Sequence, residues 1–268
     1  MHKPTHGATP GGKINPGSRP AGATDEASSA EMVRAMFDRI APRYDLLNHV
    51  LSCNVDRTWW WRAARRFRHV LARPEAKVLD ICCGTGDMTM ALLRRRPERG
   101  KPVTAADFSE VMLDRARAKL AGRSVRFLTA DAMRLPFEDG SLDLITTAFG
   151  FRNLVNYRAG LAEFLRVLKP GGELGILDCS QPGGLMGKVF GFYFRRVLPK
   201  IGARISGDAV AYGYLPSSVE GFPPPAAMVA MMRQSGFVEV EWKPYTFGIA
   251  GLWRGRKPEG SRQPEPVA

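Results

Sequence analysis

The sequence predicts a doubly wound α/β domain built on a mostly parallel sheet of seven strands. From residue 77 onward, short apolar runs alternate with segments whose apolar residues recur at helical spacing. The first run, Val78–Cys82, places apolar residues on both faces, as a buried parallel strand does. It leads into Gly84 and Gly86, which permit a sharp turn that opens a helix.

The remaining strands follow along the chain, each bounded by turn residues or by a helical pattern. They are expected over Val103–Ala106, Val125–Ala130, Leu142–Phe149, Glu173–Cys179, Val238–Trp242 and Phe247–Trp253. Because helical patterns fill three of the four connections among the first five, these strands should be parallel with right-handed crossovers. The three connecting helices are indicated by Met88, Leu92 and Leu93, by Ser109 as an N-cap, and by Leu161, Phe164 and Leu168. A last helix is expected over Ala226–Gln234.

Other segments frame this alternation and set the expected domain limits. Residues 31–73 have a helical pattern that Pro42 breaks, and residues 181–224 form an aromatic-rich insertion after the fifth strand. Residues 1–30 and 258–268 should be disordered tails, because they hold too little apolar surface to offset chain entropy. The sequence thus predicts one folded domain over residues 31–257.

Composition limits the compartment and the partners. No secretory signal or membrane-spanning apolar run is found, so a cytoplasmic or peripheral location is expected. The four cysteines lack metal-ligand spacing, which favours structural thiols and no metal site. The net charge of +13 gathers in basic segments that also hold aromatic residues, near residues 57–73 and 185–204. Such segments fit an anionic membrane surface, a nucleic acid or simply a solvated face.

The glycine turn indicates a nucleoside-containing cofactor. Asp107 ends the second strand about twenty residues after Gly86, where an acid can bind both ribose hydroxyls. Thr89 stands where a dinucleotide site has its third glycine, so no pyrophosphate cradle is evident. A cofactor with a ribose and no phosphates fits better, and S-adenosylmethionine is one. Asp131-Ala132, after the third strand, can meet an adenine edge, although a turn-forming aspartate is an equal alternative.

Several separated motifs resemble one family. They are Tyr44-Asp45-Leu46-Leu47-Asn48 followed by Ser52, Arg57 and Trp59, then Phe149–Asn153, Arg166–Gly172 continuing to Ser180, and Tyr212–Val219 with Phe222-Pro223. In this order they are similar to the ubiquinone/menaquinone biosynthesis C-methyltransferases, which are class I S-adenosylmethionine-dependent enzymes with a Rossmann-like sheet. The match runs from about Met32 to Lys257. His49, Asn54, Asp56, Ala148 and Asp178 depart from the family pattern, whereas Cys82-Cys83 is more like the menaquinone-pathway members.

The resemblance implies transfer of a methyl group to a ring carbon of a prenylated hydroquinone, most simply demethylmenaquinol, with the ubiquinone precursor left open. Ring-hydroxyl deprotonation would activate that carbon, and a positive group would stabilise the phenolate. Arg152 is the expected electrostatic group, with Asn153 or Tyr44 orienting the hydroxyl, and water, Asp45 or His49 as the base. The residues expected to hold the cofactor are Asp80, Gly84, Thr85, Gly86, Asp107, Asp131 and Ala132.

Other functions remain open at this point. The acceptor could be another lipid or a small aromatic molecule, or the chain could be a non-catalytic scaffold that binds the cofactor. A nucleic-acid substrate is disfavoured, because Thr147–Phe151 lacks the Asn/Asp-Pro-Pro-Tyr/Phe pattern of base amino-methylation. A prenylated quinol implies contact with an anionic membrane, for which the 185–204 segment is the candidate, either as interface or as a lid. A homo-oligomer is left open.

Overall fold

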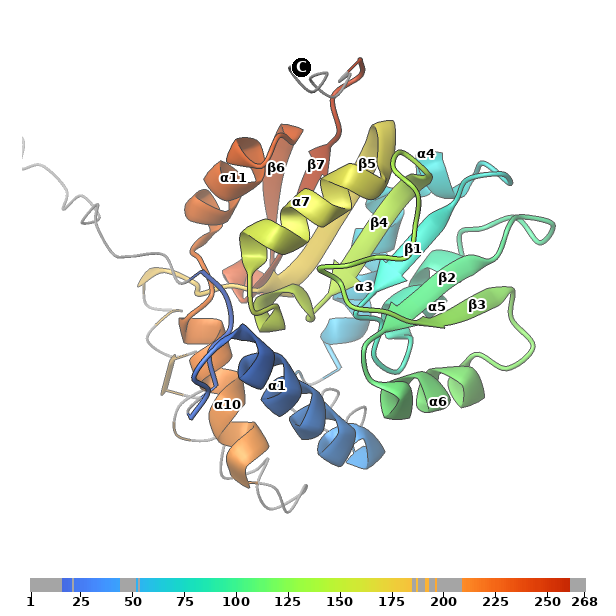
Figure 1. Cartoon of the computed structure of the whole chain (residues 1–268). Coiled ribbons are helices and arrows are strands. Elements are labelled where there is room, and N and C mark those ends of the chain that lie inside the picture. Colours follow the sequence, from blue (N-terminus) through green and yellow to red (C-terminus); the bar gives the residue numbers. More distant parts are fainter. Residues whose placement is uncertain are drawn as a thin grey trace, which may run out of the picture.

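The computed structural model describes residues 16–20, 22–43, 52, 54–184, 187, 191–192, 196 and 209–260. Its strands form one seven-stranded sheet in the order β3-β2-β1-β4-β5-β7-β6 (Figure 1). The strands are β1 (Val78–Ile81), β2 (Val103–Asp107), β3 (Val125–Thr129), β4 (Leu142–Ala148), β5 (Leu168–Cys179), β6 (Val238–Tyr245) and β7 (Ala250–Arg256). Pairing from β3 through β5 is parallel, whereas β7 is antiparallel to β5 and β6. The doubly wound, mostly parallel sheet is therefore confirmed.

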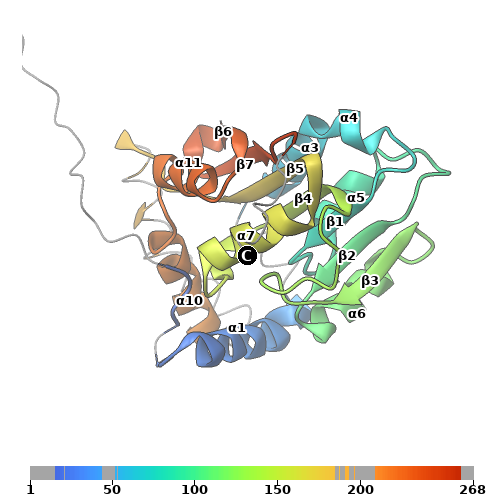
Figure 2. The same ribbon diagram turned by 45° about the horizontal axis from the view of Figure 1, so that its top comes forward.

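Helices cover both faces of this sheet. They are α1 (Glu26–Ile40), α3 (Asp56–Arg66), α4 (Arg68–Leu71), α5 (Asp87–Leu93), α6 (Glu110–Lys119), α7 (Tyr157–Val167), α10 (Ala209–Glu220) and α11 (Pro225–Gln234), with short 3₁₀ turns η1 (Ala41–Arg43), η2 (Phe151–Asn153) and η4 (Thr246–Gly248). Seen along the sheet, α7 and α11 lie on one face, and α3, α4 and α5 lie on the other (Figure 2). Helix α1 lies across the carboxyl edge of the strands, beside α10 (Figure 1).

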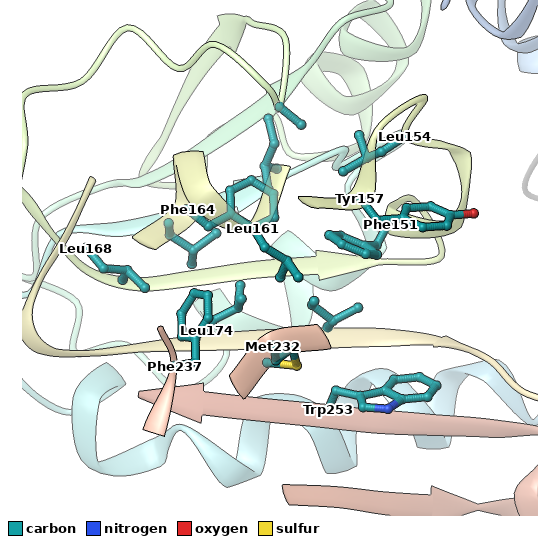
Figure 3. Packing of buried hydrophobic residues seen from close by; sticks show 14 of the residues in the cluster. Phe151, Leu154, Tyr157, Leu161, Phe164, Leu168, Leu174, Met232, Phe237 and Trp253 are labelled. Carbon is teal, nitrogen blue, oxygen red and sulfur yellow. The ribbon is translucent and has the colours of Figure 1, made fainter. Parts of the chain in front are cut away.

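Two large apolar clusters fix this arrangement, one on each face of the sheet. The cluster under α7 and α11 joins Phe164, Met232 and Trp253 to the inward side of β4 and β5 (Figure 3). It extends to Phe151 and Tyr157, whose rings stack with centroids 5.5 Å apart. The α7 face therefore anchors η2 directly, and η2 follows the end of β4 at the carboxyl edge of the sheet.

The first helix begins earlier than the sequence predicts. Helix α1 starts at Glu26 rather than at residue 31, because Asp25 and Ser28 form a capping box. The Asp25 carboxylate accepts a hydrogen bond from Ser28 N, and the Ser28 hydroxyl accepts one from Asp25 N. Ser18 is only 6% exposed, so part of the expected tail packs on the domain. The boundary at residue 30 was thus too late, because docking onto a preformed surface orders a segment that has no core of its own.

Strand limits differ from the predicted limits where turns intervene. Strand β6 extends to Tyr245, and β7 begins at Ala250 instead of Phe247, because η4 occupies the intervening residues. Thr246 and Phe247 have φ of 44° and 57°, which lie outside the extended range of a regular strand. Strand β5 begins at Leu168 rather than at the predicted Glu173, and it includes the Pro170–Gly172 turn. Its register against β4 is irregular near Leu142.

Candidate active site

A cavity of about 530 Å³ lies at the carboxyl edge of the sheet. Its walls come from the ends of β1, β2 and β4, from the loop after β3, and from one side of α1. The lining residues used below are Glu31, Arg34, Phe37, Cys82, Gly84, Asp107, Phe108, Asp131, Ala132, Met133, Phe149, Gly150 and Asn153. Ligands of doubly wound sheets bind at this edge. The structure thus collects residues from distant parts of the sequence where the fold class places a ligand.

Close approach of two strand ends shapes the floor of the cavity. Cys82 after β1 and Phe149 after β4 have φ of 55° and 57°, a left-handed conformation that is uncommon for non-glycine residues. A Cβ atom on Gly150 would lie 2.3 Å from the Cys82 Cβ, so a glycine is required there. Packing by Trp59 and Trp60, whose rings lie 5.8 and 6.4 Å from the Phe149 ring, holds the second strand end in place. Strain of this kind is common at functional sites.

Asp107 is the buried carboxylate of the cavity. Its Oδ2 accepts a hydrogen bond from Gly84 N at 2.8 Å, and its Oδ1 accepts one from Ser109 N at 3.0 Å. These bonds hold the carboxylate at the tip of β2 and tie it to the glycine turn. Burial raises the pKa of Asp107 to about 6, despite the backbone donors that favour its charged form. The carboxylate is still mostly ionised at neutral pH and can accept hydrogen bonds from a bound ribose.

Asp131 and Ala132 form an adjacent wall. Asp131 is exposed to the cavity side and its Oδ1 accepts a hydrogen bond from Met133 N at 2.9 Å, which shapes the turn after β3. Ala132 is buried and presents a small side chain next to Met133. The sequence-based expectation placed both at this edge, and the structure brings them to the same cavity as Gly84 and Asp107.

Other expected cofactor residues lie behind this wall. Asp80 is fully buried, with its carboxylate accepting from Thr89 Oγ1 at 2.6 Å and from Thr146 Oγ1 at 2.8 Å. Thr85 is buried, and its hydroxyl accepts from Lys119 Nζ at 3.0 Å. Gly86, with φ of 92°, is the N-cap of α5. None of these three lines the cavity, so their contribution is to fix the turn that presents Gly84.

Replacing Asp80 with asparagine is expected to stabilise the protein at pH 8. Burial raises the pKa of Asp80 to about 7, whereas an unfolded aspartate titrates near 3.9. The folded state therefore binds more protons between these values, and stability falls as the pH rises through this window. D80N should raise the free energy of unfolding by roughly 1–4 kcal/mol at pH 8, at about 1.4 kcal/mol per unit of pKa shift.

Chemical denaturation of wild type and D80N at several pH values measures this effect. The two proteins should converge below about pH 4, where the wild-type carboxyl is protonated in both states. An asparagine can also donate to one threonine and accept from the other, so both hydroxyls keep a partner. A D80N protein less stable than wild type at pH 8 would show that the charged carboxylate stabilises the fold.

The segment after β4 carries Arg152 and Asn153, the adjacent residues expected to be catalytic, but only one of them lines the cavity. Asn153 lines the cavity. Arg152 is 6% exposed and turns inward, where its Nη1 donates to Asp178 Oδ1 at 2.8 Å and to Phe149 O. Asp178 is fully buried and accepts also from Arg152 N at 3.0 Å. The structure therefore places Arg152 in an internal ion pair that holds η2, and not in the cavity lining. Tyr44, Asp45 and His49 lie outside the described residues.

Two contributions to the site were missed by the sequence analysis. One side of α1 supplies Glu31, Arg34 and Phe37, which in the sequence form an ordinary amphipathic pattern. The other is Tyr214 of α10, whose hydroxyl donates to Asn153 Oδ1 at 3.1 Å. Tyr214 belongs to one of the family-like motifs, but nothing in that motif indicates which side chain the hydroxyl contacts.

The lining favours a ligand that is partly cationic and partly apolar. The charged groups of the described wall are three carboxylates, from Glu31, Asp107 and Asp131, and one guanidinium, from Arg34. Phenylalanine and methionine side chains make up much of the remaining surface. A sulfonium compound with a ribose and an adenine matches this mixture, because the acid at β2 can bind hydroxyls and the apolar wall can hold the ring.

Comparisons with known proteins agree with this geometry. The model of the ubiE/COQ5 methyltransferase family matches residues 24–257. A demethylmenaquinone methyltransferase from Deinococcus radiodurans is 48% identical over 236 residues, covering 87% of this chain and 95% of the relative. One from Thermus thermophilus is 47% identical, covering 83% and 100%. A ubiquinone/menaquinone biosynthesis C-methyltransferase from Shewanella pealeana is 40% identical, covering 85% and 91%.

Solved structures support the fold. The [4+2]-cyclase SpnF superposes with a TM-score of 0.62 at 16% identity, covering 85% of this chain and 96% of that chain. An S-adenosylmethionine-dependent methyltransferase from Thermotoga maritima gives a TM-score of 0.58 at 20% identity, covering 84% and 99%. At these identities the likeness concerns the Rossmann-like fold alone. With the family match over nearly all of its folded length, the chain belongs to the ubiE/COQ5 methyltransferase family.

Proposed function

We propose that this methyltransferase moves a methyl group from S-adenosylmethionine to a ring carbon of demethylmenaquinol, giving menaquinol. The observation that carries the proposal is the 47–48% identity to demethylmenaquinone methyltransferases over at least 95% of their length. The cavity supports it, because it offers a ribose-binding acid and an apolar wall side by side. Relatives at 40% identity have names that include ubiquinone, so the ubiquinone precursor is the second acceptor to test.

Residues at the carboxyl edge would hold the cofactor. Asp107 would accept hydrogen bonds from the ribose hydroxyls, Gly84 would allow close approach of the backbone, and Asp131 with Ala132 would meet the adenine edge. Glu31 adds a third carboxylate favourable to a positive charge. When bound, the cofactor supplies an electrophilic methyl group on a sulfonium, so the protein need not generate the electrophile.

The protein's own chemical task is to activate the acceptor. A ring hydroxyl with a pKa near 10 must lose its proton before the neighbouring carbon becomes strongly nucleophilic. Asn153 and Arg34 both line the described cavity and can donate a hydrogen bond to the resulting phenolate, and Asn153 is the one of the two that the resemblance assigns to the acceptor. Arg152 acts through Asn153, since its ion pair with Asp178 fixes η2, and it is therefore a positioning residue. Tyr44, Asp45, His49 or water would orient the hydroxyl or accept the proton.

The acceptor's isoprenoid tail would bring the protein to a membrane. No helix in the described part of the chain is long and apolar enough to cross a bilayer. The proposal includes a peripheral position at the cytoplasmic face, with the 185–204 segment against anionic headgroups. Most of that segment lies outside the described residues, but Phe192 within it is 64% exposed. Flotation with anionic vesicles, compared with neutral vesicles, tests this position, and absence of binding to both would contradict it.

Methyl transfer from labelled S-adenosylmethionine tests the proposed reaction. Purified protein in detergent or vesicles would be offered reduced demethylmenaquinone and the unmethylated ubiquinone precursor separately, and the product mass would be measured. Turnover of the first alone assigns the menaquinone pathway, and turnover of both indicates a dual-pathway enzyme. Cofactor binding without turnover of either would contradict the proposal and favour another lipid or aromatic acceptor, or a scaffold role.

A further inference from the structure

The segment of residues 16–20 packs against the loop that follows Asn153. Ser18 N donates to Leu154 O at 2.7 Å, and Tyr157 N donates to Pro16 O at 2.9 Å. The Arg19 guanidinium donates to Val155 O at 2.7 Å. These bonds hold the segment against residues 154–157 from two sides. Its glycine- and proline-rich sequence is thereby ordered at the rim of the cavity, which Leu154 and Val155 also line.

This docking completes a line of hydrogen bonds that ends in the cavity. The Ser18 hydroxyl lies 2.6 Å from the Tyr214 hydroxyl, and the Tyr214 hydroxyl donates to Asn153 Oδ1 at 3.1 Å. A phenolic hydroxyl has one proton. Because Tyr214 gives that proton to Asn153, Ser18 must be the donor to the Tyr214 oxygen. The line therefore has a direction, from residue 18 through α10 to the cavity wall.

The direction determines what Asn153 can offer a ligand. Its carbonyl oxygen is occupied by Tyr214, and one N–H of its amide donates to Phe149 O at 3.3 Å. An amide nitrogen carries two hydrogens, so one donor remains. Without the Tyr214 hydroxyl, only the weak bond to the Phe149 carbonyl would oppose a half-turn about the last side-chain bond, which would exchange the two ends of the amide and present an acceptor instead. An acceptor would repel a phenolate oxygen that a donor stabilises.

We propose that Tyr214 and Ser18 are positioning residues, which keep the Asn153 amide turned so that it donates to the ring oxygen of the methyl acceptor. The inference rests on the proposed function, because it presumes a hydroxylated ring in this cavity. Tyr214 is well suited to remain a donor, since burial raises the pKa of its hydroxyl, although the hydrogen bond with Ser18 and the charge of Arg152 oppose this effect and Asp178 adds to it. Residues 16–20 thus support the active-site wall from outside the cavity, through Tyr214 and residues 154–157.

Replacing Tyr214 with phenylalanine tests the proposal, because it removes only the hydroxyl. Y214F should lower kcat at neutral pH about tenfold or more, as expected for loss of one oriented donor at a developing oxyanion. It should also move the acidic limb of the kcat–pH profile to higher pH, since the bound ring hydroxyl becomes harder to ionise. The dissociation constant for S-adenosylmethionine should not change. S18A should show a smaller shift in the same direction, and S18T, which retains a hydroxyl, should restore the wild-type profile.

Ser217 supplies the matched control. It lies on the same helix, and its hydroxyl donates to the Tyr214 backbone carbonyl at 2.7 Å, outside the line to Asn153. S217A should therefore leave the pH profile in place. If wild type is active and Y214F keeps both its kcat and its profile, the proposal is wrong. If Y214F loses activity without a shift of the profile, Tyr214 is merely structural, which also overturns it. Wild type without turnover of either quinol would refute the proposed function itself.

Discussion

Replacing Arg152 with methionine is expected to abolish most methyl transfer and to lower the free energy of unfolding by about 3–5 kcal/mol. The Asp178 carboxylate, fully buried at 0% exposure, would lose its guanidinium partner and keep only backbone N–H donors. Removing one member of a buried pair is costly because the remaining charge is neither hydrated nor compensated. Because Arg152 also holds the Phe149 carbonyl, the loss should loosen η2 and displace Asn153 from the cavity wall.

A second variant separates loss of structure from loss of chemistry. R152M/D178N removes both charges, and the introduced asparagine side chain can still accept from the backbone N–H of residue 152. Most of the stability lost in R152M should return. If activity returns with stability, Arg152 is a positioning residue, as its burial suggests. A stable but inactive double variant would instead show that the guanidinium assists the reaction electrostatically. Urea unfolding and turnover on the same preparations give both quantities.

Replacing Asp107 with asparagine is expected to raise the dissociation constant for S-adenosylmethionine about a hundredfold. Asparagine is nearly isosteric but keeps an oxygen for only one of the two backbone donors, so the change removes the charge and one backbone hydrogen bond. Hydrogen bonds to charged groups contribute roughly 1.5–3 kcal/mol each, and two ribose hydroxyls are expected here. Calorimetric titration of the cofactor measures the change, and the melting temperature without cofactor checks the fold.

The pH dependence of binding gives an independent check. The pKa of Asp107 is raised to about 6 by burial, and only the ionised carboxylate accepts from both hydroxyls. Wild-type affinity should therefore be constant above this value and fall about tenfold per pH unit below it, whereas D107N should lack this slope. Asp114 on the solvent side of α6 supplies the control, because D114N removes an exposed carboxylate that pairs with Arg117. An unchanged dissociation constant in D107N would reject the ribose assignment.

The proposed cofactor side of the cavity followed from the sequence more fully than the proposed acceptor side did. Gly84, Asp107 and Asp131 lie directly at strand ends, and parallel strands bring their carboxyl ends to one edge whatever the side-chain details. Asp80 had the same local signal, but strand alternation and two threonines turn its carboxylate into the core. Neighbouring residues of a strand point to opposite sides, so one can line a cavity while the next is buried beneath it. The motif alone did not show which of these positions Asp80 takes.

The acceptor side depends on contacts between segments far apart in the chain. Adjacent residues Arg152 and Asn153 both donate to the Phe149 carbonyl, yet only Asn153 lines the cavity, because the ion pair with Asp178 keeps the Arg152 side chain in the interior. The turn η2 that carries them is anchored by Phe151 in the core (Figure 3). Tyr214 reaches Asn153 across 61 positions, and Ser18 reaches Tyr214 across 196. No local pattern encodes such pairings. The sequence of residues 16–20 has the composition of a disordered tail, because it supplies no core of its own. The distant contacts that dock this segment likewise leave no local pattern.

By itself, the sequence determined the strand and helix alternation, the ligand edge and the family, because periodic burial, glycine turns and ordered motifs are local properties of the chain. Only the tertiary structure decided which polar side chains line the cavity and which pair with other groups in the interior. Burial makes that distinction: a charged group without solvent must find a partner, as Arg152 finds Asp178, and only the folded chain determines which partner is within reach.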